Sequence, residues 1–153
     1  MKKIVLVFAV FLMTVACFAE SGKIYSSIDS ATLLGIMKQQ GYSAELNNNA
    51  DIIWRKDGVV SHILFSNGRK NESNFYFFCC YSYDADKSAK ALDLCNEYNK
   101  KNKFGKSYVF NGAVCYCLSI NLRGGVTEER IIDYLDDCMV FSKQWKKLVV
   151  EKL

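Results

Sequence analysis

Three cysteines lie where the β-strands that the sequence predicts could bring thiols together. Cys115 and Cys117 are two residues apart in a run that reads as a strand, so their side chains point to the same face. The more polar positions of the strand before it place Cys80 on that face and Cys79 inside. Thiols on a shared face could form a disulfide, carry out redox exchange or bind a metal ion.

The spacing of these cysteines argues against a metal or redox site. Structural zinc sites usually show paired Cys-x-x-Cys or mixed Cys/His spacing, and the sequence has neither. A thioredoxin-like motif is also missing, and Cys-x-Cys on a strand is a poor chelate. We expect no metal and no cofactor. Inert thiols are favoured, followed by a disulfide within the outer trio of Cys80, Cys115 and Cys117, and pairing across a dimer is a further alternative.

His62 is the only histidine and the other residue that could carry chemistry. A hydrolase could use it as a base, but no nucleophile elbow or zinc-binding helix accompanies it. The adjacent pairs Glu128-Glu129 and Asp136-Asp137 diverge around their helix and do not converge on a site. The sequence also has no phosphate-binding glycine loop and no dinucleotide fingerprint. It therefore predicts no catalytic residues, and a protein that is not an enzyme.

Hydrophobic spacing and turn residues predict three helices and six strands to position these side chains. The predicted elements are a helix capped by Asp29 or Ser30 and running to Gln40, strands at 42–46, 51–56, 59–66 and 74–83, a helix at 85–102, strands at 106–110 and 113–122, and a helix from Thr127. Turns such as Asp57-Gly58 and Asn111-Gly112 favour antiparallel hairpins. The predicted fold class is α+β, a single twisted antiparallel sheet with helices on one face, in the order α-β-β-β-β-α-β-β-α.

The alternation along the last strand assigns its two faces. Cys115 and Cys117 share the outer face with Ser119 and Asn121. The residues that point the other way are apolar and should belong to the core: Val114, Tyr116, Leu118, Ile120 and Leu122.

The N-terminus has the pattern of a secretory signal peptide. Lys2 and Lys3 precede an apolar run from Ile4 to Val15, and small residues follow. We expect residues 1–19 to be removed, with cleavage before Glu20, and the protein to be exported to the periplasm or beyond. Because the segment around Cys17 resembles a lipoprotein cleavage box, a lipid anchor on Cys17 is the alternative, and it is the only membrane attachment we expect.

Residues 20–153 are long enough for one domain with its own core. Loss of Lys2 and Lys3 lowers the count of Lys and Arg from 20 to 18, against 16 acidic residues. That balance favours no particular partner and argues against nucleic acid.

Four motifs in this order and spacing resemble the YbjN-type domain, the family of bacterial sensory transduction regulators. They are Gly41-Tyr42 after the first helix, Asn96-Glu97-Tyr98-Asn99, Phe104-Gly105-Lys106 before a tyrosine-bearing strand, and Gly124-Gly125-Val126-Thr127 before the last helix. The resemblance covers Leu33 to Leu148. It implies an α+β fold similar to type III secretion chaperones, which are small dimer-forming modules that bind proteins, and it implies no catalytic residues.

The residues that carry this resemblance have a structural interpretation. The asparagines can cap a helix end or the adjoining loop, the glycines allow tight reversals, and the threonine hydroxyl can cap the last helix. The residues concerned are Asn96, Asn99, Gly105, Gly124, Gly125 and Thr127.

Together these patterns predict an exported, non-enzymatic module that binds a protein or peptide in the cell envelope. We expect a homodimer that makes contact through the free face of the sheet or through the last helix. The alternatives are a thiol-redox or hydrolytic envelope enzyme that uses Cys115, Cys117 or His62, and a lipid-anchored structural protein of the envelope.

Overall fold

The computed structural model describes residues 22–66 and 70–153, so the predicted signal peptide 1–19, with Cys17, lies outside the described residues. In chain order the elements are β1 (Ile24–Tyr25), α2 (Ser30–Gln39), β2 (Ala44–Leu46), β3 (Ile52–Lys56), β4 (Val59–Leu64), β5 (Asn74–Ser82), a 3-10 turn (Ala85–Lys87), α3 (Ser88–Lys101), β6 (Lys106–Phe110), β7 (Ala113–Asn121), β8 (Val126–Thr127) and α4 (Glu128–Lys152).

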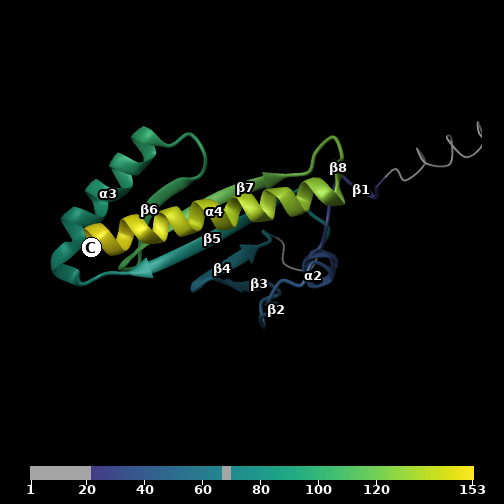
Figure 1. Cartoon of the computed structure of the whole chain (residues 1–153), viewed down its shortest axis with the longest axis horizontal. Helices are drawn as coiled ribbons and strands as arrows, with labels where there is room; N and C mark the ends of the chain where they lie inside the picture. The colour runs from purple at the N-terminus through teal and green to yellow at the C-terminus, as the bar shows by residue number, and fades with distance from the viewer. Residues whose placement is uncertain (1–21, 67–69) are drawn as a thin grey trace, which may run out of the picture.

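Six of the strands form one open sheet in the order β2-β3-β4-β5-β7-β6, and every neighbouring pair is antiparallel. The helix α4 runs along β5 and β7, the two longest strands, while α3 packs beside β6 (Figure 1). The buried residues of all three helices join the inward-facing strand residues in one apolar cluster. The predicted α+β fold, an antiparallel sheet with helices on one face, is confirmed.

Two details of the strands differ from the prediction. The small sheet of β1 and β8 is not among the predicted elements, because strands of two residues carry no periodicity. The strand β2 begins at Ala44 rather than at Tyr42, since the N–H of Tyr42 donates to the carbonyl oxygen of Met37 (3.0 Å) and completes the end of α2.

Side-chain caps set the beginnings of α2 and α4. Asp29 caps α2, because its side chain accepts a hydrogen bond from the N–H of Thr32 (2.7 Å). The hydroxyl oxygen of Thr127 accepts from the N–H of Arg130 (3.2 Å) in the same way at the start of α4. These caps are the ones that the sequence predicts.

Large aromatic rings fill the core between the sheet and the helices. Trp145 of α4 is fully buried, and its ring centroid lies 5.0 Å from that of Tyr98 and 6.4 Å from that of Tyr116. Inward-facing apolar residues of the sheet that are 0% exposed are Ile52, Trp54, Ile63, Phe75, Phe77, Cys79, Val114 and Tyr116. Cys79 therefore lies inside, and Leu118 and Ile120 contact the core as predicted.

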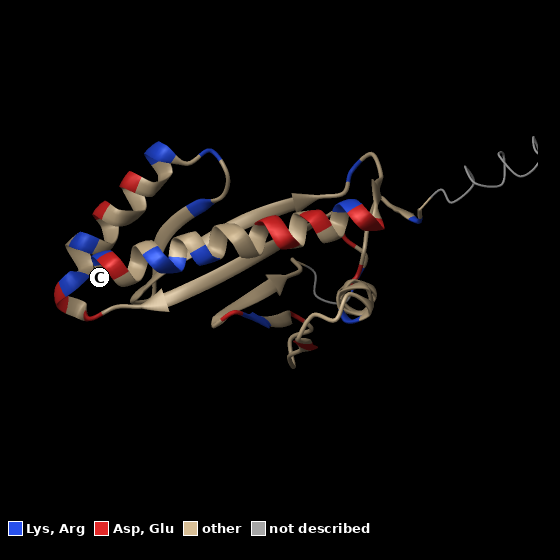
Figure 2. Ribbon diagram, viewed as in Figure 1, with Lys and Arg blue, Asp and Glu red and all other residues tan. Residues whose placement is uncertain are grey.

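Charged side chains tie α4 to the hairpin of β3 and β4. Acidic residues gather in the first half of α4 and lysines in the second (Figure 2), an order that suits the helix dipole at its two ends. Lys56 pairs with Asp136 at 3.1 Å, Lys143 pairs with Asp57, and Lys146 donates to the carbonyl oxygen of Gly58 (2.7 Å). The hairpin turn is thereby held against the helix.

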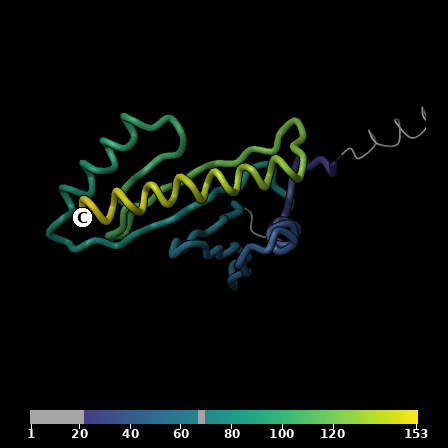
Figure 3. Tube along the Cα trace, viewed as in Figure 1, coloured from purple at the N-terminus to yellow at the C-terminus, as the bar shows by residue number. Residues whose placement is uncertain are grey.

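The carboxyl terminus lies beside the beginning of α3 (Figure 3), where Lys87 donates to the carbonyl oxygen of Leu153. In the described ranges, no helix combines the length and the apolar character that crossing a membrane requires.

Candidate functional site

The outer face of the sheet is the side away from the helices. It carries the residues identified from the sequence as able to react, namely Cys80, Cys115, Cys117 and His62. It is formed by alternate residues of β3 to β7, and many of them are apolar or aromatic. None of the described helices contributes a buried residue to this side. Val60, Tyr108 and Phe110 are 47%, 39% and 57% exposed. We call outer face the set Ile53, Val60, His62, Leu64, Tyr76, Phe78, Cys80, Tyr108, Phe110, Cys115 and Cys117.

Two of the three outer cysteines are bonded. The register places Cys80 of β5 directly opposite Cys115 of β7, their Cα atoms are 4.2 Å apart, and their sulfur atoms form a disulfide. Cys117 lies on the same face as a partly exposed free thiol. The structure thus joins two members of the trio and leaves the third unbonded.

The free thiols are poorly suited to nucleophilic or metal chemistry. Burial raises the pKa of the Cys117 thiol, and it raises the pKa of Cys79 to about 12. Burial also raises the pKa of Cys95 and of Cys138. Protonated thiols neither attack nor bind metals well. Among the described residues no three His, Cys, Asp or Glu side chains are grouped so as to hold a metal ion.

His62 lies on the outer face, two strands away from Cys115 and Cys117 of β7. It stands opposite Ile53 of β3 on one side and Phe78 of β5 on the other. Phe78 in turn is opposite Cys117, so a whole strand separates the imidazole from that thiol. Hence the histidine is not brought together with Cys115 or Cys117 as a catalytic group.

Asn99 joins α3 to the edge strand of the sheet. Its amide nitrogen donates to the carbonyl oxygen of Ser107 (2.8 Å), and its amide oxygen accepts from the N–H of Ser107 (2.9 Å). The side chain thus takes the place of a neighbouring strand at this point of β6 and occupies backbone groups that could otherwise pair with another chain. Asn96 is exposed and forms no such bond among the described residues.

We predict that Asn99→Ala lowers the free energy of unfolding by about 1–3 kcal/mol, because the two backbone groups of Ser107 lose their partner. Urea unfolding followed by tryptophan fluorescence measures the change. Asn96→Ala is the matched control and should change stability by less than about 0.5 kcal/mol. Equal effects of the two substitutions would contradict the assignment of Asn99 as the residue that joins α3 to β6.

The glycines and the threonine of the sequence motifs also support the scaffold. Gly105 has φ +70° and lies against the ring of Tyr116. Gly124 and Gly125 have φ +89° and +90°, and they turn the chain between β7 and β8. With Thr127 as a helix cap, these residues stabilise turns and ends and do not line the outer face.

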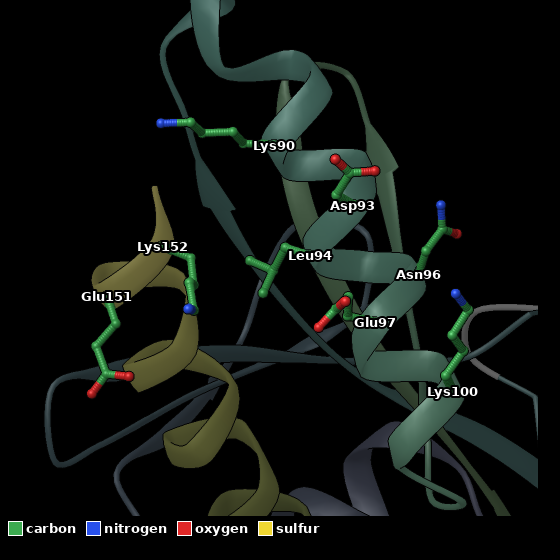
Figure 4. A pocket seen from close by; sticks show the side chains of 8 residues that line it. All are labelled: Lys90, Asp93, Leu94, Asn96, Glu97, Lys100, Glu151 and Lys152. Carbon is green, nitrogen blue, oxygen red and sulfur yellow. The ribbon is translucent and has the colours of Figure 1, made fainter.

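A second candidate site is the hollow between α3 and the end of α4, with a volume of about 550 Å³. Leu94 lies between the two helices, and Asn96 points away from α4 (Figure 4). Three basic and three acidic side chains line the hollow, so their charges balance. The lining residues are Lys90, Asp93, Leu94, Asn96, Glu97, Lys100, Glu151 and Lys152. With one apolar residue and no net charge, it selects no ligand class.

Known proteins that are similar to this chain support the same fold. The profile of the YbjN family, described as "Putative bacterial sensory transduction regulator", matches residues 29–137. Among solved structures, the chain is similar to the crystal structure of YbjN from E. coli, which is titled a putative transcription regulator. The TM-score is 0.65 at 14% sequence identity, over 84% of this chain and 93% of that one. No curated protein matches the chain.

Proposed function

The chain belongs to the YbjN family, and on that premise we propose that it is a regulatory module that binds protein through its outer face and pairs there with a second copy of itself. The supporting observation is the set of apolar side chains on that face that no described helix covers. Large apolar patches of this kind mark interaction sites on soluble domains.

The shape and charge of the outer face suit another sheet. Six strands spaced about 4.8 Å apart give a face roughly 25 Å wide, and two sheets pack with about 10 Å between them. Its charged residues lie on the outer strands β2, β3 and β6, where Glu45 and Arg55 form an ion pair of 2.7 Å and Lys106 is exposed. An uncharged centre favours a self-complementary contact over a strongly acidic or basic partner.

We predict that Val60→Glu with Phe110→Glu converts a dimer into a folded monomer, because self-association would have to take both carboxylates out of water. Sedimentation velocity at micromolar concentration measures the mass. Leu92→Glu with Val140→Glu is the matched control, since these residues are 53% and 51% exposed on the helices. The proposal fails if the wild-type chain is a monomer, or if the control pair disrupts the dimer equally.

We further propose that the module acts outside the cytoplasm, in the periplasm or beyond. The support for this part is the sequence of residues 1–19 alone. The first residue of the protein isolated from its own cells tests it: Glu20 is expected, lipid-modified Cys17 would indicate an anchored form, and Met1 would contradict export.

A further inference from the structure

The two cysteines of the outer-face disulfide differ sharply in their exposure to solvent. Cys80 is exposed, whereas Cys115 is 0% exposed although it lies on the same face. Tyr108 of β6 is directly opposite Cys115, and Phe78 of β5 is directly opposite Cys117. The two rings approach to 6.1 Å across β7. The aromatic rings of Phe78 and Tyr108 thus cover Cys115 on β7, while Cys80 on β5 stays exposed.

We infer that the Cys80–Cys115 disulfide is a thiol-exchange site of fixed direction, in which a small external thiol becomes bonded to Cys80 and Cys115 is released. Thiolates attack a disulfide along its axis and need access to the sulfur that they attack. In this structure only Cys80 offers that access. The class of ligand is a low-molecular-weight monothiol.

The step balances without any other reactant. The incoming thiolate forms a new S–S bond to Cys80, the Cys80–Cys115 bond breaks, and Cys115 leaves as a thiolate that takes a proton from solvent. Since the backbone keeps Cys115 opposite Cys80, the Cys115 thiolate can attack Cys80 and expel the bound thiol. The modification is therefore reversible by the protein's own second cysteine.

Cys117 does not compete for this exchange. Burial raises the pKa of its thiol, so it is protonated near neutral pH, and the rings of Phe78 and Tyr108 lie across β7 in its neighbourhood. A free thiol and a disulfide can thus share one face of the sheet without exchanging. If the proposed function holds, a thiol adduct on Cys80 would also place a bulky polar group on the outer face and prevent partner binding.

The test uses two single variants that both lack the disulfide, Cys115→Ser and Cys80→Ser, each treated with oxidised glutathione at low protein concentration. Tandem mass spectrometry that separates position 115 from position 117 identifies the adduct. We expect glutathione on Cys80 of the first variant to form at least about tenfold faster than on Cys115 of the second, because access limits the reaction. Equal rates, or faster modification of Cys115, would overturn the inference.

The wild-type chain provides a check if either variant loses its native circular dichroism. The chain is treated briefly with reduced glutathione at a protein concentration at which sedimentation velocity shows a monomer, so that self-association does not cover Cys80. After acid quenching and alkylation in denaturant, glutathione should be on Cys80 and the alkyl group on Cys115. The reverse pattern, or no adduct on Cys80 at a concentration that modifies the denatured chain, would overturn the inference. A monomeric wild-type chain would contradict the proposed self-association without affecting this result.

Discussion

Replacing Gly105 with alanine is expected to lower the free energy of unfolding by about 2–5 kcal/mol. A residue with a Cβ atom pays about 1–2 kcal/mol in the left-handed region, and Gly105 has φ +70°. The new Cβ would also clash with a ring carbon of Tyr116. That ring is fully buried and packs against Tyr98 and Trp145, so it has little room to move. Overpacking of this kind costs about 1–3 kcal/mol more.

The variant Gly112→Ala separates the cost of the backbone conformation from the cost of overpacking. Gly112 has nearly the same backbone angle, φ +72°, but a Cβ there would meet no heavy atom within 4 Å. Its substitution should cost only the conformational part, about 1–2 kcal/mol. Urea unfolding of both variants, followed by tryptophan fluorescence, gives the comparison. If both variants lose the same stability, the contact between Gly105 and Tyr116 contributes nothing.

Short-range rules explain why much of the fold is predictable from the sequence. Asp29 and Thr127 cap helices because their side chains reach backbone groups three residues away. The hairpin of β6 and β7 follows from Asn111-Gly112, whose φ angles of +47° and +72° fit a two-residue turn. Alternation of side chains likewise assigns the faces of β5 and β7. Each inference needs only a few neighbouring residues.

Contacts between distant segments could not be predicted in the same way. The pairing of β5 with β7 joins strands separated by α3 and β6, so the sequence could place Cys80 and Cys115 on one face but not opposite each other. The cover that Phe78 and Tyr108 give to β7 depends on the same pairing. The reach of Asn99 to Ser107 depends on how α3 packs beside β6, which no local pattern specifies.

The location of the family-like residues bears on function. Asn99 joins a helix to an edge strand, Gly105 admits the ring of Tyr116, and Thr127 caps α4. Each of these roles stabilises the scaffold, and none contributes a side chain to the outer face. Membership in the family therefore accounts for the fold, while the partner binding that we propose would depend on residues such as Val60 and Phe110, which are exposed on the outer face.

Substitution of a buried residue in the second half of α4 is also expected to cause a large loss of stability. The family match ends at residue 137, yet the core continues through Ser142, Trp145 and Val149. We predict that Trp145→Ala lowers the free energy of unfolding by about 3–5 kcal/mol, since a fully buried indole leaves a large cavity. That is a large share of the roughly 5–15 kcal/mol that stabilises a typical domain, so the variant should be partly unfolded at 37 °C.

Two further substitutions on α4 test the reason for this effect. Trp145→Phe should cost much less than alanine, because an aromatic ring remains against Tyr98 and the removed indole N–H has no hydrogen-bond partner among the described residues. Val150→Ala, at a position 73% exposed on the same helix, should change stability by less than about 0.5 kcal/mol. Thermal unfolding followed by circular dichroism suits all three variants. Were Trp145→Ala no more harmful than Val150→Ala, the end of α4 would not belong to the cooperative core.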